Sequence, residues 1–229
     1  MLSVNNSQHL NSTNSRFYRD KILLIWFSGG VLLIFCMITL GGITRITDSG
    51  LSMVDWNLIM GVLPPLNQEE WLILFENYKN YPEYKMINVG MNLAEFKVIF
   101  WFEYSHRILG RFIGLYFIIP FIIFLFFRVL DKKNIVLMLL LISLGASQGF
   151  LGWYMVKSGL LESPDVSQYR LVSHYSLALF IYVILLWNTF CKLDVKKKEK
   201  KLVKKKLIYF IFISWLFFVM VSGVFMAGT

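Results

Sequence analysis

The chain has 229 residues, of which 57% are hydrophobic and 16% charged, and its mean hydropathy is +0.60. A soluble domain of this size could not bury so much apolar surface, so the composition predicts an all-α integral membrane protein. The net charge of +9 does not indicate nucleic-acid binding, because the basic residues gather in short segments between apolar runs.

The chain begins with a polar tail, residues 1–21, of which 1–15 are rich in Asn and Ser. We expect no regular structure in 1–15. The first apolar run lacks the short hydrophobic region and small-residue cleavage site of a signal peptide, which predicts an uncleaved membrane span.

Five apolar segments are long enough to cross the ~30 Å hydrocarbon layer as helices. They are residues 22–43, 98–127, 134–156, 170–190 and 207–227. We expect the first four to form a transmembrane bundle within 22–190. The fifth, in 207–229, is expected to begin a second, incomplete bundle, because Phe35–Gly42 in the first span is echoed by Phe218–Gly223.

Basic residues predict the topology through the positive-inside rule. They precede the first span, join the second to the third, and fill the linker 191–206 between the fourth and fifth. We therefore expect a cytoplasmic N-terminus and an outer loop at 44–97, where acidic residues outnumber basic ones.

The outer loop is long enough to contain ordered structure. Asn67 followed by Glu70 resembles a capping box and predicts an amphipathic helix through Trp71, Phe75 and Tyr78. Such a helix could lie over the mouth of the bundle. An interfacial aromatic belt explains Trp71 and Tyr78 equally well.

Two histidines, His106 and His174, lie just inside the same end of the second and fourth spans. Histidine is costly in hydrocarbon and by default marks a functional site. Neutral imidazoles on facing helices can be the axial ligands of haem iron. The pair therefore predicts a haem site.

Residues around His106 form one helical stripe with Glu103, Arg107, Gly110 and Gly114. Gly110 could let a porphyrin face approach, but it could equally serve close helix packing. Gln148 on the third span could hydrogen-bond a ligand or bridge two helices.

Three arginines at the outer rim, Arg45, Arg107 and Arg170, could hold haem propionates in bidentate fashion. The alternative for them is ion pairing with Glu103, Asp48 or Asp55. Glu103 could relay protons or stabilise an oxidised carbon, which would indicate an enzyme, or it could simply pair with Arg107.

At these residues the chain resembles the haem A synthase family, from about residue 22 to its end. The matching stretches are Gly41–Trp56, Pro64–Pro65, Gln68–Trp71, Glu95–Lys97, Glu103–Arg107 with Gly110–Arg111, Gln148–Gly159, and Ser167–Arg170 with His174. The mitochondrial and alphaproteobacterial branch is the most similar, because the outer loop lacks a cysteine pair.

The resemblance implies an eight-helix protein of two four-helix halves that oxidises the C8 methyl of haem O to the formyl of haem A. It implies His106 and His174 as ligands of the substrate haem, Glu103 as the catalytic acid, and a haem b in the C-terminal half. This chain ends after five helices and lacks the second histidine pair, so we expect no turnover by these residues alone.

Expected partners are haem O, an unidentified electron donor, haem O synthase and cytochrome oxidase assembly factors, with homo-oligomerisation left open. The expected location is the bacterial inner membrane, with the mitochondrial inner membrane as the alternative. Two other functions stay open, a b-type cytochrome electron carrier and a non-catalytic haem-binding assembly subunit. Identifying the extracted haem would separate them from the enzyme.

Overall fold

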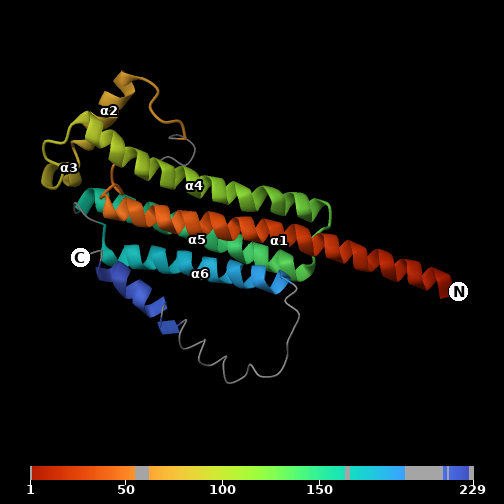
Figure 1. The fold of residues 1–229 in the computed structure, drawn as a ribbon. Coiled ribbons are helices and arrows are strands. Elements are labelled where there is room, and N and C mark those ends of the chain that lie inside the picture. Colours follow the sequence, from red (N-terminus) through yellow and green to blue (C-terminus); the bar gives the residue numbers. More distant parts are fainter. Residues whose placement is uncertain (1, 55–61, 163–165, 194–213, 216, 227–229) are drawn as a thin grey trace.

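The computed structural model describes residues 2–54, 62–162, 166–193, 214–215 and 217–226 of the chain. Six main helices are present (Figure 1). They are α1 (Leu2–Ile46), α2 (Gln68–Tyr78), α3 (Pro82–Met86), α4 (Leu93–Phe126), α5 (Lys132–Glu162) and α6 (Gln168–Lys192). The described residues contain no strand, which confirms the all-α prediction.

Four helices are long and apolar enough to cross a membrane. Their spanning parts are Tyr18–Ile46, Leu93–Phe126, Lys132–Ser158 and Gln168–Lys192. They confirm the first four predicted spans, and the chain is a multi-pass membrane protein. Of the predicted fifth span, 207–227, the structure describes a short apolar helix at Phe217–Met226, and most of the remainder lies outside the described residues.

The four long helices form a ring in which α1 packs beside α4 and α6, and α5 packs beside the same two helices. The helices α4 and α6 therefore lie diagonally across the bundle. Both run away from the end where α2 and α3 lie (Figure 1). We call that end the cap end, and the described residues 47–54 and 62–92 the cap; the opposite end is the distal end.

The N-terminal part of α1 corrects one expectation. The helix begins at Leu2, where residues 1–15 were expected to lack regular structure, and it projects beyond the other helices (Figure 1). The physical reason is that extending an existing helix adds one hydrogen bond per residue without a new nucleation cost.

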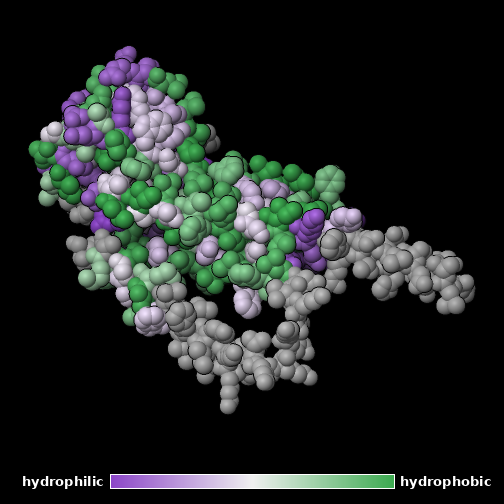
Figure 2. Space-filling model, viewed as in Figure 1, coloured by the Kyte–Doolittle hydropathy of each residue, from purple (hydrophilic) through white to green (hydrophobic). Residues whose placement is uncertain are grey.

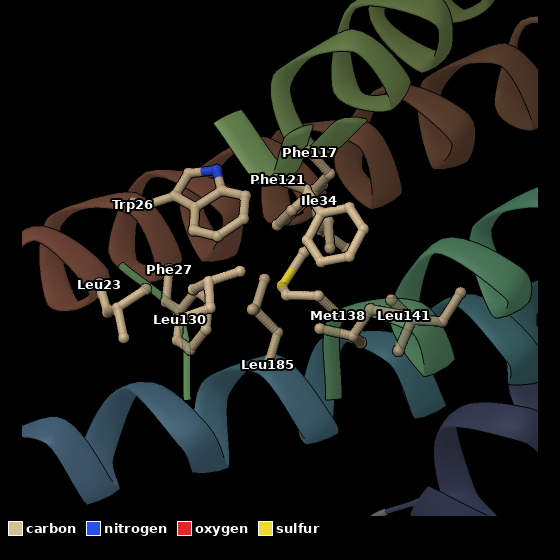
Figure 3. Packing of buried hydrophobic residues seen from close by; sticks show 11 residues of the cluster. Leu23, Trp26, Phe27, Ile34, Phe117, Phe121, Leu130, Met138, Leu141 and Leu185 are labelled. Carbon is tan, nitrogen blue, oxygen red and sulfur yellow. The ribbon is translucent and has the colours of Figure 1, made fainter. Parts of the chain in front are cut away.

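The distal half of the bundle has a continuous hydrophobic core drawn from all four helices (Figure 3). Pro120 within α4 has no N–H and therefore leaves the carbonyl of Tyr116 without its helical donor. The indole Nε1 of Trp26 donates to that carbonyl at 3.0 Å. The Tyr116 hydroxyl donates in return to the Trp26 carbonyl at 2.8 Å, so this pair joins α1 to α4.

Glycines let the distal helices approach closely. A Cβ at Gly29 would overlap the Tyr116 hydroxyl, and one at Gly30 would overlap the Phe117 ring. At the distal surface, Lys192 pairs with Asp20 at 3.3 Å, which joins α6 to α1.

The cap contains a second hydrophobic cluster, formed by α2 and the first turns of α4. The predicted start of α2 is confirmed, because the Asn67 side chain accepts from the Glu70 amide and the helix begins at the next residue. The Glu70 carboxylate accepts from the Leu66 amide and the Asn67 side chain, so the reciprocal bond of a capping box is replaced by these two. Trp71 and Tyr78 are buried within this cluster, which favours the helix packed over the bundle and not the interfacial aromatic belt. Hydrophilic residues gather on the outside of the cap, whereas the bundle surface is largely hydrophobic (Figure 2).

Candidate functional site

The two histidines lie on the diagonal helices, His106 on α4 and His174 on α6. Both are near the cap end of their helix. Among the described residues no three His, Cys, Asp or Glu side chains gather as metal ligands. The site thus offers two imidazole donors on diagonal helices, and histidine is a common ligand of haem iron.

The level of the bundle that contains the histidines differs from the levels on either side. No residue is buried in the four stretches that form it, which are 35–48 at the end of α1 and just beyond it, 104–115 of α4, 142–158 of α5 and 166–178 at the start of α6. Fully buried side chains resume below this level in the distal core and above it in the cap. Side chains of the chain itself therefore fill this level less completely than its neighbours.

Each imidazole lies against a glycine of an adjacent helix. A Cβ at Gly41 of α1 would come within 3.2 Å of His106 Nε2, and a Cβ at Gly152 of α5 within 3.0 Å of His174 Cε1. The Nδ1 atom of His174 is buried and has no hydrogen-bond partner in the described part of the chain. These glycines leave room at the rings that any other residue would reduce.

Glu103 lies one turn nearer the cap than His106 and is 4% exposed. Its Oε2 accepts from the Ser52 hydroxyl and from the Met53 amide, each at 2.7 Å. Its Oε1 accepts from Arg107 Nη2 at 2.5 Å. The carboxylate is therefore held on both sides, and it ties the first turn of the cap to α4.

The hydroxyl of Ser52 has three acceptors within hydrogen-bond distance, and its single proton can point to any one of them. Besides Glu103 Oε2, the carbonyl of Ser49 lies at 3.0 Å and that of Ile99 at 3.3 Å. If Glu103 gained a proton, Ser52 could accept from it and turn its own proton to a carbonyl. The carboxyl group thus has a hydrogen-bond partner in either protonation state.

The rim arginines have partners within the chain. Arg107 Nη2 also donates to the Met53 carbonyl at 2.9 Å, and Arg45 pairs with Asp48 at 3.6 Å. Arg170 lies over the Tyr154 ring, 5.0 Å from its centroid. Ion pairing, the alternative for Arg45 and Arg107, is present, and Asp55 lies outside the described residues.

Two further predicted site residues contact neighbouring helices. Gln148 Nε2 of α5 donates to the main-chain carbonyl of His174 at 3.0 Å, and its Oε1 is buried with no partner among the residues that the structure describes. A Cβ at Gly110 would lie 3.3 Å from Met37 of α1. Gln148 therefore bridges two helices at the histidine, and Gly110 contributes to the packing of α4 on α1.

Sequence reasoning missed Ser52 and the contacts of Gly41 and Gly152 with the histidines. Gly41 and Ser52 each lie about 50 residues or more from their α4 partners, and no local pattern signals such pairs. The only available signal was their presence in the motif-like stretch Gly41–Trp56.

Comparison with known proteins places these residues in a family. The COX15-CtaA family, described as cytochrome oxidase assembly protein, matches residues 24–229. The chain is 44% identical to the heme A synthase of Nitrosospira multiformis over all of this chain and 65% of that protein. It is 45% identical to that of Pelagibacter ubique over 91% of this chain and 61% of that protein.

The heme A synthase of Bradyrhizobium diazoefficiens is 49% identical over 71% of this chain and 45% of that protein. The chain thus spans about half to two thirds of the length of these relatives. No solved structure matches it. The family match covers both histidines, the Glu103 network, three spanning helices in full and the fourth, α1, from residue 24. The chain therefore belongs to the COX15-CtaA family of cytochrome oxidase assembly proteins.

Proposed function

We propose that these residues are the substrate-binding half of a haem A synthase, which oxidises the C8 methyl of haem O to the formyl of haem A. The observation that carries the proposal is that two histidines stand on diagonal helices near the same end, at a level of the bundle where no described residue is buried as a whole. Relatives named heme A synthase support it.

The residues present fit a haem. Neutral imidazoles are common axial ligands, and the glycine beside each ring leaves space that a Cβ would fill. The Nδ1 atom of His174, buried without a hydrogen-bond partner among the described residues, is a polar ring atom that the chain itself leaves unsatisfied. His106 and His174 would hold the haem, with Gly110 and Gln148 beside it and Arg45, Arg107 and Arg170 toward its propionates.

The bound haem would supply the redox chemistry of the site, and the chain would supply position and protons. Oxidation of a methyl to a formyl by two successive hydroxylations with oxygen consumes protons and electrons at each step. Glu103 is the group that could hold a proton next to the haem. Ser52 and the Met53 amide fix its carboxyl group, while Arg107 balances its charge.

The rest of the reaction needs groups outside these residues. We propose a haem b in the C-terminal half of the complete protein and an electron donor that reduces it. Haem O synthase is the class of enzyme that must supply the substrate, and cytochrome oxidase assembly factors would receive the product. We place the protein in the bacterial inner membrane with a cytoplasmic N-terminus, because the basic residues gather at the distal end.

Haem content and haem type test the ligand assignment. In the full-length protein, His106→Ala and His174→Ala should each greatly reduce haem in this half, because each removes one of the two donors. His9→Ala, at the third histidine of the chain, should leave haem content unchanged. Full haem content with an unshifted Soret band in either site variant would refute the assignment.

Glu103→Gln tests the enzyme against the electron carrier. We expect normal haem binding but accumulation of haem O or its hydroxylated form, because the amide cannot hold the proton. Glu76→Gln, at an exposed glutamate that pairs with Lys79, is the matched control and should make haem A normally. Normal haem A production by Glu103→Gln would reduce the acid to a structural partner of Arg107. Haem b alone in the wild-type protein would favour the b-type cytochrome.

A further inference from the structure

The two candidate ligands share a packing arrangement that neither the ligand assignment nor the chemistry requires. In each case an antiparallel pair of neighbouring helices contributes one glycine and one histidine. The pair α1 and α4 contributes Gly41 and His106, and the pair α5 and α6 contributes Gly152 and His174. The site is thus made of two similar units on opposite sides of the bundle.

In both units a larger residue would crowd the ring. A Cβ would lie 3.2 Å from His106 Nε2 at Gly41 and 3.0 Å from His174 Cε1 at Gly152, and both distances are shorter than the ordinary contact range of 3.4–4 Å. Alanine at either position would therefore require the ring to move by a few tenths of an ångström. His106 meets the glycine with Nε2 itself, the nitrogen that most often binds haem iron.

Packing has a larger part than usual in orienting His174. A ligating histidine ordinarily donates its other ring N–H to a carbonyl or carboxylate, which fixes the ring. His174 Nδ1 is buried and has no such partner among the described residues. Gln148, which bonds to the same residue, donates to its main-chain carbonyl and leaves the ring free to turn.

Resting on the proposed function, we propose that Gly41 and Gly152 are positioning residues that set the planes of the two axial imidazoles. Each presents bare backbone to one edge of a ring, Gly41 to the Nε2–Cδ2 edge of His106 and Gly152 to the Cε1 edge of His174, and this contact limits the rotation that the ring can adopt. The mutual orientation of the imidazole planes affects the electronic structure of a low-spin ferric haem. Through the orientation of the two rings, the two glycines would therefore influence the electronic structure of the haem that the histidines bind.

The chain provides a matched control for each glycine. Gly42 neighbours Gly41, and Gly149 lies one turn from Gly152, yet a Cβ at either would meet nothing within 4 Å. Replacement by alanine raises helix propensity similarly at all four positions, by about 1 kcal/mol. Any difference between the test and control variants must then come from contact with the ring.

The experiment uses the full-length protein purified with its haem. We expect Gly41→Ala and Gly152→Ala to shift the electron paramagnetic resonance g values of the ferric haem and to weaken haem retention about 10-fold or more, as for residues that support metal ligands. Gly42→Ala and Gly149→Ala should match the wild type. Unchanged g values in both test variants, or equal changes in the controls, would overturn the proposal.

A second measurement covers a test variant that folds poorly. In the His174→Gly variant, free imidazole added to the solution can take the place of the missing ring. Unlike the His174 side chain, it is not attached to α6 and can move. The effect of Gly152→Ala should then disappear, because the free ligand can shift away from the new methyl group. A persistent effect would show that Gly152 acts on helix packing and would overturn the proposal. Loss of haem in His106→Ala and His174→Ala tests the ligand assignment separately, so failure of one idea is distinguishable from failure of the other.

Discussion

The distal half and the histidine level of the same four-helix bundle are packed in opposite ways. Distal glycines are covered by aromatic side chains, as Gly29 is by Tyr116 and Gly30 by Phe117. A Cβ at Gly114, at the histidine level, would meet no atom within 4 Å. Small residues in the distal half therefore lie against aromatic rings, whereas those at the histidine level divide between glycines in close contact, such as Gly41 and Gly152, and glycines that leave space, such as Gly114.

The two regions also treat polar groups differently. In the distal half, Trp26 and Tyr116 exchange uncharged hydrogen bonds that compensate for Pro120. Next to the histidines, a buried carboxylate is held by an arginine, a hydroxyl and an amide. The first arrangement stabilises the bundle, whereas the second keeps a charge where a proton could be used.

Among the substitutions that test this comparison, removal of the Arg107 side chain should lower the stability of the protein most. Arg107→Ala leaves the buried Glu103 carboxylate without its counter-ion, which we expect to lower the free energy of unfolding by about 3–5 kcal/mol. Arg45→Ala, which breaks the exposed pair with Asp48, should cost only about 0–1 kcal/mol. Denaturant titration of the haem-free protein in mild detergent measures both.

A double substitution checks the physical reason. Adding Glu103→Gln to Arg107→Ala removes the uncompensated charge, so most of the lost stability should return. If the double variant is as unstable as Arg107→Ala alone, the cost comes from lost packing and not from the buried charge.

Ser52→Ala tests the other side of the same carboxylate. We expect a loss of about 1.5–3 kcal/mol, the usual contribution of a hydrogen bond to a charged group, and faster proteolysis of the loop that follows α1. Ser147→Ala is the control, because that exposed serine bonds only to its own helix. Equal proteolysis of the two variants would mean that Ser52 does not anchor the cap.

Trp26→Phe should weaken the distal half by about 1–3 kcal/mol, because it leaves the Tyr116 carbonyl without a donor. Pro120→Ala restores an N–H that can bond to that carbonyl. In the Pro120→Ala background the same tryptophan substitution should therefore cost much less. Equal costs in both backgrounds would assign the role of Trp26 to packing alone.

The smallest effect is expected at the distal surface, where Asp131 accepts from the Asn134 amide at 2.9 Å just before α5. That bond, aided by Arg19, lowers the pKa of Asp131 in the folded protein. Its stabilisation is therefore present above the unfolded pKa of about 3.9 and is lost as the pH falls through the folded value.

Asp131→Ala should accordingly cost about 1 kcal/mol at neutral pH. The difference from the wild type should shrink in acid. Asp131→Asn keeps a capping oxygen without a titrating group, so it should retain most of the stability. Unfolding curves at neutral and acidic pH measure this difference. An equal loss of unfolding free energy in Asp131→Ala, relative to the wild type, at both pH values would contradict this account.

Much of the site could be predicted because its evidence is local. Helix spans follow from runs of apolar residues, the α2 cap from Asn67 and Glu70, and the two candidate ligands from histidines within hydrocarbon. The ion pairing of Arg107 with Glu103 was an open alternative because the two are four residues apart on one helix. Each of these patterns lies within a few turns of chain.

The sequence by itself determined that this is a helical membrane protein with two histidines near one end of its second and fourth spans, because hydropathy and spacing depend only on neighbouring residues. Only the tertiary structure decided that Ser52 meets Glu103, that Trp26 compensates for Pro120, and that one glycine lies against each imidazole. Those contacts depend on the rotation and register of each helix against its neighbours. Both are set by packing across the whole bundle, and no local pattern records them.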